Sequence, residues 1–215
     1  MPPLEALKLL GSLLVSQKVS KRGKPLKLAF WDISRAHFYA TAQRNIYMQL
    51  PDEDYEPGKC GMLKKSMYGT MDSSHVWQED YSNNLGKAGH ERGKSNGAIF
   101  WQPEEDSRSL VHGDDFAVLA DDDAIESMDK ELSKHYSCKM TAKIGFEPGD
   151  SREALMLNRV LRCVPVTPNI FEIEGDRRHS DIIVDQLGLT DAKAATTPLV
   201  KEQMALSCVA VSWSR

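Results

Sequence analysis

Two apolar segments of this chain carry acidic residues where β-strands are expected. The first, 26–32, ends on Asp32, and the second, 110–119, is interrupted by Asp114 and Asp115. Burying an ionised carboxylate costs free energy unless a partner replaces its hydration. A bivalent metal ion is such a partner when several carboxylates converge on it. The sequence therefore predicts a fold in which these three carboxylates converge on metal.

The composition is that of a soluble globular protein, with 41% hydrophobic and 27% charged residues among 215. That length allows one domain with a substantial core, or one domain plus an appendage. The four cysteines form no C-x-x-C pair, so reduced thiols are expected. The N-terminal residues lack the pattern of a secretory signal, and no apolar stretch reaches membrane-spanning length. We therefore expect a cytoplasmic or nuclear protein without a membrane association.

The charges are unevenly placed along the chain. A net charge of −4 argues against a general nucleic-acid-binding protein. Residues 18–27 are nevertheless basic and contain no acid, so this segment could contact phosphate groups. The acidic residues gather in three short runs, 52–54, 104–106 and 121–123. Such runs are typical of solvated loops, and we expect that here.

The hydrophobic periodicity predicts an alternation of strands and helices. Helices are expected over 3–15, from Ser73 to a stop at Gly86 and Gly89, from about Asp123, and from a cap at Ser180 to Gly188. Strands are expected over 26–32, 98–101, 109–112, 116–119 and 171–173. Gly113 and Asp114 fall at a hairpin tip, because both residue types tolerate tight turns. The predicted fold class is α+β, with helices packed against one antiparallel sheet.

Several segments, taken in order, resemble the reverse transcriptase of copia-type LTR retrotransposons. Asp32–Phe38 is similar to the first catalytic motif of that family, and Ile46–Pro51 to its I-Y-M-x-x-P stretch. Residues 63–77 align without gaps on its L-K-K-S-L-Y-G block, which closes on a tryptophan. His112–Asp115 stands where Y-V-D-D is expected, and Ala195–Leu199 is similar to a closing T-P-L segment.

This resemblance implies a polymerase palm and RNA- or DNA-templated DNA synthesis by two-metal nucleotidyl transfer. The catalytic and metal-binding residues it implies are Asp32, Asp114 and Asp115, with Mg²⁺ or Mn²⁺ as cofactor. Its partners would be an RNA or DNA template-primer and a dNTP. The oligomeric state is left open.

The resemblance also assigns substrate-binding residues. His37 or Phe38 would form the floor of the sugar pocket, although Phe38 is equally compatible with core packing. Tyr68 and Gly69 would approach the nascent base pair, although Tyr68 could equally be a core residue. Asp72 would face nucleotide or template. Trp77, in contrast, is expected in the core because of its helical neighbours.

The sequence departs from the family at several positions. Asp72 replaces a glutamine and would bring the wrong charge to the substrate, Met71 replaces a lysine, and His112 and Gly113 replace a tyrosine and a valine. The family's basic fingers segment, which precedes the first motif, is expected to be truncated here, with the basic loop at 18–27 as a partial substitute. The predicted organisation is an N-terminal helix and basic loop (1–25), a palm-like domain (26–145), a partial thumb- or connection-like segment (146–200) and a tail (201–215).

Three hypotheses follow. The leading one is a retrotransposon-derived reverse transcriptase domain, with impaired activity as one form of it. The second is a catalytically inactive remnant of the polyprotein that binds at most metal or nucleic acid. The third, an unrelated metal-dependent phosphohydrolase, is weaker, because the sequence shows no further His or Glu ligands of the kind such sites use.

Overall fold

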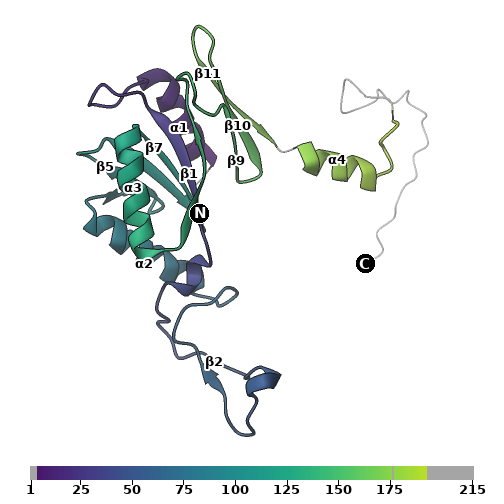
Figure 1. Ribbon diagram of the computed structural model, residues 1–215. Helices are drawn as coiled ribbons and strands as arrows, with labels where there is room; N and C mark the ends of the chain where they lie inside the picture. Colours follow the sequence, from purple (N-terminus) through teal and green to yellow (C-terminus); the bar gives the residue numbers. More distant parts are fainter. Residues whose placement is uncertain (1–3, 176, 193–215) are drawn as a thin grey trace, which may run out of the picture. The chain divides into compact units, whose positions relative to one another are not determined.

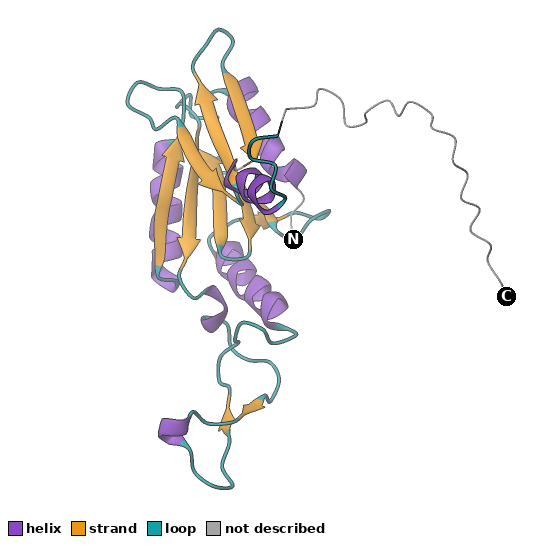
Figure 2. Cartoon of the chain, turned by 90° about the vertical axis from the view of Figure 1, so that its right-hand side faces the viewer, coloured by secondary structure: helices purple, strands orange, loops and turns teal. Residues whose placement is uncertain are grey.

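The computed structural model describes residues 4–175 and 177–192, and they form two compact units divided after Gly175. The first unit is built on an antiparallel sheet of six strands in the order β4-β5-β6-β7-β1-β8. Figure 2 shows this sheet with helices packed against it. The strands span Glu91–Arg92 (β4), Ile99–Gln102 (β5), Ser107–His112 (β6), Asp115–Ala120 (β7), Lys27–Ile33 (β1) and Cys138–Ile144 (β8).

One face of this sheet is covered by two helices, α2 (Ser73–Lys87) and α3 (Asp122–His135). They bury the alternate β1 residues Trp31 and Ile33, together with Phe116 of β7. Helix α2 contributes Trp77, Tyr81 and Leu85, and α3 contributes Ile125, Met128 and Leu132. This is the pattern of a strand buried on both faces, in which each face receives every second residue.

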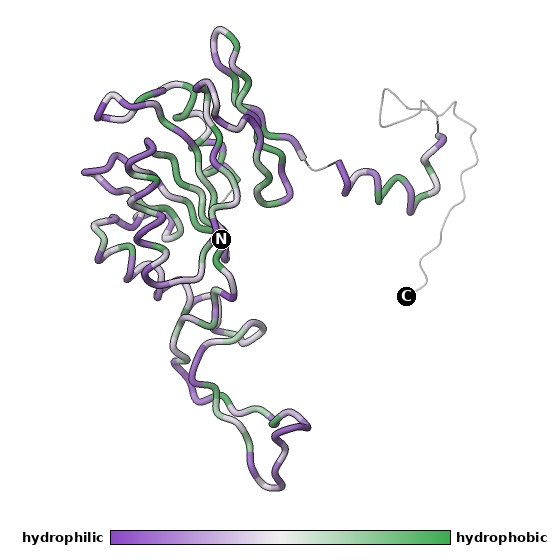
Figure 3. Tube along the Cα trace, viewed as in Figure 1, coloured by the Kyte–Doolittle hydropathy of each residue, from purple (hydrophilic) through white to green (hydrophobic). Residues whose placement is uncertain are grey.

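The opposite face is covered by helix α1 (Leu4–Gln17) and a second, three-stranded sheet. The strands of that sheet are β9 (Glu153–Met156), β10 (Arg159–Val164) and β11 (Ile170–Gly175), in the order β11-β10-β9. Leu28 and Phe30 of β1 lie in this second core with the leucines of α1. Figure 3 shows hydrophobic residues concentrated along the central strands, where the two cores meet.

A segment between β1 and α2 projects from the six-stranded sheet (Figures 1 and 2). It contains a small two-stranded sheet of β2 (Tyr47–Met48) and β3 (Gly61–Met62). A short 3-10 helix, Asp52–Asp54, lies between these strands, and its three acidic side chains are exposed. The acidic run 52–54 is therefore solvated, as expected.

Much of the predicted secondary structure is confirmed. The helices expected over 3–15, from Ser73 and from about Asp123 correspond to α1, α2 and α3, and the strands expected over 26–32, 98–101, 109–112, 116–119 and 171–173 are present. The predicted stop at Gly86 is wrong, because α2 continues to Lys87, whereas Gly89 lies beyond its end with a φ of +85°. The α+β class, with helices on an antiparallel sheet, is also confirmed. Strands β8, β9 and β10 and the two-residue strands β2, β3 and β4 were not predicted.

The second unit contains helix α4 (Arg177–Gln186), in which the hydrophobic run 182–184 lies between hydrophilic residues (Figure 3). Ser180 was expected to cap this helix, and that prediction is wrong, because α4 begins at Arg177 and Ser180 lies inside it. Gly188 follows the helix with a φ of +65°, which agrees with the predicted stop. The T-P-L-like segment Ala195–Leu199 and the tail 201–215 lie outside the described residues.

Two further expectations can be compared with the described part of the chain. Its three cysteines, Cys60, Cys138 and Cys163, are free thiols. Within residues 4–175 and 177–192, no helix is long and apolar enough to cross a bilayer.

Helix α1 approaches β11 closely because residue 11 is glycine. A Cβ atom at Gly11 would overlap the ring of Phe171. Alanine normally stabilises a helix interior relative to glycine by roughly 0.5–1 kcal/mol. Overpacking a core costs roughly 1–3 kcal/mol.

We therefore expect Gly11→Ala to lower the free energy of unfolding by roughly 1–2 kcal/mol in urea denaturation. Gly86→Ala is the matched control, because the corresponding space in α2 is open, and it should be stabilising. In a Phe171→Ala background Gly11→Ala should also become stabilising. A destabilisation that persists in that background would contradict the proposed overlap.

Candidate functional site

Asp32 and Asp115 face each other across neighbouring strands. Asp32 lies near the end of β1, Asp115 is the first residue of β7, and the two are direct partners in the antiparallel register. The same register places His112 of β6 opposite Asp115, and Lys139 of β8 opposite Asp32. Directly opposed residues of antiparallel strands lie on the same face of a sheet, with Cβ atoms roughly 4.5–5.5 Å apart. Four ionisable side chains therefore form one row across the sheet.

Asp114 lies in the tight turn between β6 and β7, beside this row. Gly113 precedes it with a φ of +66°, a backbone conformation that favours glycine. The indole Nε1 of Trp77 donates to the carbonyl oxygen of Gly113 at 2.7 Å, and Ile33 N donates to the carbonyl oxygen of Asp114 at 3.0 Å. The turn is thus held by α2 on one side and by the end of β1 on the other. Trp77 is only 2% exposed, which confirms its predicted place in the core.

The carboxylates of this row repel one another. The pKa of Asp115 is raised above its ordinary value, first by burial and then by the negative charges of Asp114 and Asp32, while His112 acts in the opposite sense. No described residue donates a hydrogen bond to the Asp115 carboxylate. A cation bound among these groups would offset both the cost of burying the Asp115 carboxylate and the repulsion between the carboxylates.

The donor set fits a hard divalent cation. Carboxylate oxygens are the ligands that Mg²⁺ and Mn²⁺ prefer, and two of the three carboxylates already face each other on rigid strands. In the described part of the chain, no three His, Cys, Asp or Glu side chains yet converge on a common metal position. Metal binding therefore requires a side-chain movement, for which Asp114 in the turn is best placed.

Next to the carboxylates, three aromatic rings form a cluster. The ring of His37 stacks on Tyr68 with centroids 4.2 Å apart, and Phe38 meets Tyr68 edge-on at 5.7 Å. Phe38 is 42% exposed and Tyr68 is 43% exposed, so the alternative that either is a core residue is wrong. Burial lowers the pKa of His37, although the charge of Asp114 acts to raise it. Gly69 follows Tyr68 with a φ of +85°.

Asp72 forms a two-pronged ion pair with Arg44. The distances are 2.8 Å from Nε to Oδ2 and 3.0 Å from Nη2 to Oδ1. The hydrogen bond from Arg44 holds the pKa of Asp72 below its ordinary value. The guanidinium of Arg44 therefore compensates the negative charge that Asp72 brings to this position. A role for Asp72 in substrate binding stays a prediction.

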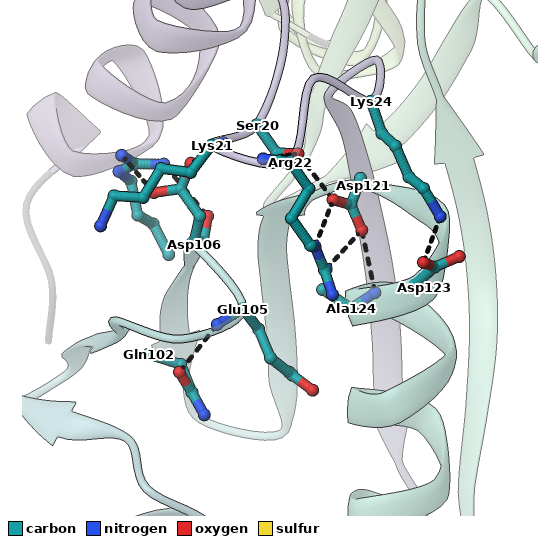
Figure 4. Close-up of polar contacts among 11 residues, drawn as sticks. Ser20, Lys21, Arg22, Lys24, Gln102, Glu105, Asp106, Asp121, Asp123 and Ala124 are labelled. Atoms are coloured by element: carbon teal, nitrogen blue, oxygen red, sulfur yellow. Dashed lines mark hydrogen bonds and ion pairs between the residues drawn. The ribbon is translucent and has the colours of Figure 1, made fainter.

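The basic segment 18–27 lies at the other end of the sheet. It leads into the first residues of β1, whereas Asp32 is near the last, roughly 17 Å away at the rise of an extended strand. Three of its basic side chains, those of Arg22, Lys24 and Lys27, pair with acidic residues, and Figure 4 shows the first two. Arg22 and Ser20 both donate to Asp121 at 2.7 Å, and Lys24 pairs with Asp123. The expectation that this loop partly replaces the fingers is therefore not supported by its position or its contacts.

Two of the acidic runs each contain one buried residue with a structural role. Asp121 is fully buried and caps α3 by accepting a hydrogen bond from Ala124 N at 3.1 Å. Burial acts to raise its pKa, but hydrogen bonds from Ser20, Ala124 and Arg22 outweigh this and lower it. Asp106 is also buried, and it accepts from Lys21 N at 3.0 Å and from Arg108 at 3.1 Å. For runs 104–106 and 121–123, the expectation of solvated loops is wrong at these two residues.

Sequence reasoning missed two charged residues of this region. Lys139 lies on β8, and the alternation of polar and apolar residues over 138–144 was a signal that could have placed it on a strand. Arg44 lies in an irregular segment, and nothing in the sequence links it to Asp72.

Comparison with known proteins decides the family. Residues 4–201 match the family described as "Reverse transcriptase (RNA-dependent DNA polymerase)". The chain belongs to this family. Reverse transcriptases in general use divalent metal ions and bind a nucleic-acid template-primer and a dNTP. The match contains every residue discussed above.

Two other comparisons add nothing to the family assignment. No curated protein matches the sequence. Among solved structures, apo telomerase from Candida tropicalis, truncated from its C-terminal domain, matches with 12% identity and a TM-score of 0.46. That match covers 79% of this chain, which spans only 39% of the telomerase chain.

The raised pKa of Asp115 predicts a pH-dependent stability. The folded state disfavours ionised Asp115, so stability is lost as the pH rises from the ordinary aspartate pKa through the raised folded value. Asp115→Asn removes this penalty. In EDTA, its melting temperature at pH 7 should exceed that of the wild type, and the difference should vanish below about pH 3. A variant less stable than the wild type at pH 7 would count against repulsion in this row.

Metal binding among the carboxylates should stabilise the folded wild-type protein. A cation bound only by the folded state at ten times its Kd adds about 1.4 kcal/mol to the free energy of unfolding. Mg²⁺ or Mn²⁺ at millimolar concentration should therefore raise the melting temperature of the wild type and not that of Asp114→Asn. Equal shifts in both proteins would place the bound metal elsewhere.

Proposed function

We propose that this chain contains the palm of a copia-type reverse transcriptase and that its reaction is template-directed DNA synthesis. The observation that carries this proposal is the cross-strand pair of Asp32 and Asp115, with Asp114 beside it, within a chain of this family. The copia-type assignment is supported by the segments Ile46–Pro51 and Leu63–Gly69. Residues 26–145 would be the palm-like part and 146–200 the thumb- or connection-like part.

The reaction joins the primer 3′-oxygen to the α-phosphorus of a dNTP and releases pyrophosphate. Bound Mg²⁺ or Mn²⁺ supplies a lowered pKa for the 3′-hydroxyl and charge neutralisation for the triphosphate. Asp32 and Asp114 would hold both ions, and Asp115 would be an outer or alternating ligand. Because β1 and β7 are rigid and central, they fix Asp32 and Asp115 without a further ordering cost.

The aromatic cluster would receive the sugar and base of the nucleotide. His37 and Phe38 lie in the turn that follows Asp32, so they are placed to contact the sugar of a nucleotide held there. Tyr68 joins this cluster from the segment before α2 and would reach the nascent base pair with Gly69. Its exposed ring leaves a stacking surface of the kind that bases use.

The experiment is extension of an oligo(dT) primer on poly(rA) in the presence of Mg²⁺ or Mn²⁺. The wild type should extend the primer, and an Asp32→Asn, Asp114→Asn double variant should lose at least about two orders of magnitude in rate, since metal-held charge stabilisation carries the reaction. Extension that survives in the double variant would overturn the assignment of these residues. No extension by a folded wild-type protein would favour an inactive remnant instead.

A further inference from the structure

Arg35 lies immediately beyond the candidate site, where the chain leaves β1. Strand β1 ends at Ile33, and a short 3-10 helix, Ala36–Phe38, begins after Arg35. Arg35 makes this reversal with φ 56° and ψ 40°, the left-handed conformation. For a residue with a side chain, this conformation costs roughly 1–2 kcal/mol, and glycine adopts it without that cost. An arginine here is therefore not explained by the needs of the turn.

The guanidinium of Arg35 is exposed and unpartnered. No described residue forms a hydrogen bond or an ion pair with it. Most arginines of the first unit are engaged with acidic side chains, as in the pairs Arg22–Asp121, Arg44–Asp72, Arg92–Glu79 and Arg108–Asp106. Arg35 thus retains five donors for an external anion.

Arg35 also lines a hollow of about 350 Å³ with Ser34, Phe38, Tyr39 and Ser137. The walls are fixed by two hydrogen bonds, from Ser34 N to the carbonyl oxygen of Ser137 at 2.9 Å and from Ser137 N to the Tyr39 hydroxyl at 2.7 Å. The hydroxyl groups of the two serines add polar lining. A cation and polar side chains around an opening are parts that a phosphate chain needs.

We infer that Arg35 binds the outer phosphates of the incoming nucleotide, an inference that rests on the proposed function. A triphosphate held through metal at Asp32 has its remaining negative charge near the end of β1, where Arg35 stands. Its planar guanidinium can pair with two phosphate oxygens at once, which a lysine cannot do. Arg35 is a positioning residue that supplies part of the positive charge which the distant basic segment 18–27 does not bring to this end of the sheet.

The left-handed backbone at Arg35 permits a substitution that removes the guanidinium without straining the fold. Arg35→Gly removes the guanidinium and relieves backbone strain, so the variant should fold at least as well as the wild type. Lys18→Gly is the matched control, because Lys18 is also an exposed cation with a positive φ, of 61°. Lys18 precedes β1 at the opposite end of the sheet, where its carbonyl oxygen accepts from Leu26 N. Both variants lose one positive charge, and only one loses it at the site.

The measurement is the Kd of dTTP for the full chain with poly(rA), a dideoxy-terminated oligo(dT) primer and Mg²⁺, in which no turnover occurs. We expect Arg35→Gly to weaken dTTP binding by roughly tenfold or more, because a hydrogen bond to a charged group is lost. The affinity of Arg35→Lys for dTTP should lie between those of the wild type and Arg35→Gly. Lys18→Gly should bind dTTP as tightly as the wild type. The affinity for dTMP should be the same in all of these proteins. In extension assays Arg35→Gly should raise the KM for dTTP more than it lowers kcat.

The possible failures are distinguishable. Equal dTTP affinity in Arg35→Gly and the wild type, with binding still lost in Asp114→Asn, overturns the role of Arg35 and leaves the proposed function standing. An equal loss in Lys18→Gly overturns it as well, by showing a general charge effect. If Asp114→Asn binds dTTP as tightly as the wild type, or if the wild type does not bind dTTP, both the role of Arg35 and the proposed function are overturned.

Discussion

The pairing register of β1 with β7 is the constraint on which the rest of the site depends. It places Asp32 opposite Asp115 and, through the same alternation, sends Trp31 and Ile33 into the core beneath α2 and α3. A slip of one residue would exchange the two faces and bury Asp32 among those side chains. The hydrophobic cores on both faces therefore hold the carboxylates in place, although neither core contains them. The hydrogen bond from Trp77 to Gly113 extends this control to the turn that carries Asp114.

Charged residues are arranged differently at the two ends of the sheet. At the end where β1 begins, basic residues of segment 18–27 pair with acidic ones, and buried Asp121 receives hydrogen bonds from three directions. At the end where β1 finishes, acidic side chains face one another, and burial together with their negative charges raises the pKa of Asp115. Paired charges stabilise a fold, whereas unpaired neighbouring carboxylates cost stability and are typical of sites that bind a cation. This contrast supports the proposed site more directly than the net charge of the chain does.

The sequence was sufficient for the elements that carry regular hydrophobic periodicity, and for the hairpin that presents Asp114. It failed where distant residues meet. The ion pair of Asp72 with Arg44 was not predicted, because Arg44 lies in an irregular segment. Asp121 of run 121–123 was read as solvated because its basic partner, Arg22, lies in the segment before β1, and only the folded sheet brings the two together. Ser180 was taken as a helix cap from its residue type alone, although α4 begins at Arg177.

The most direct test of the account is a crystal structure of the protein with Mn²⁺, with anomalous scattering used to locate the metal. We predict Mn²⁺ bound by the carboxylates of Asp32 and Asp114, with Asp115 beside it as an outer or alternating ligand. With a nucleotide bound, a second ion should appear roughly 4 Å away. Manganese bound only at other acidic residues, or carboxylates that stay apart at saturating Mn²⁺, would contradict the central claim that the β1–β7 register builds a metal site.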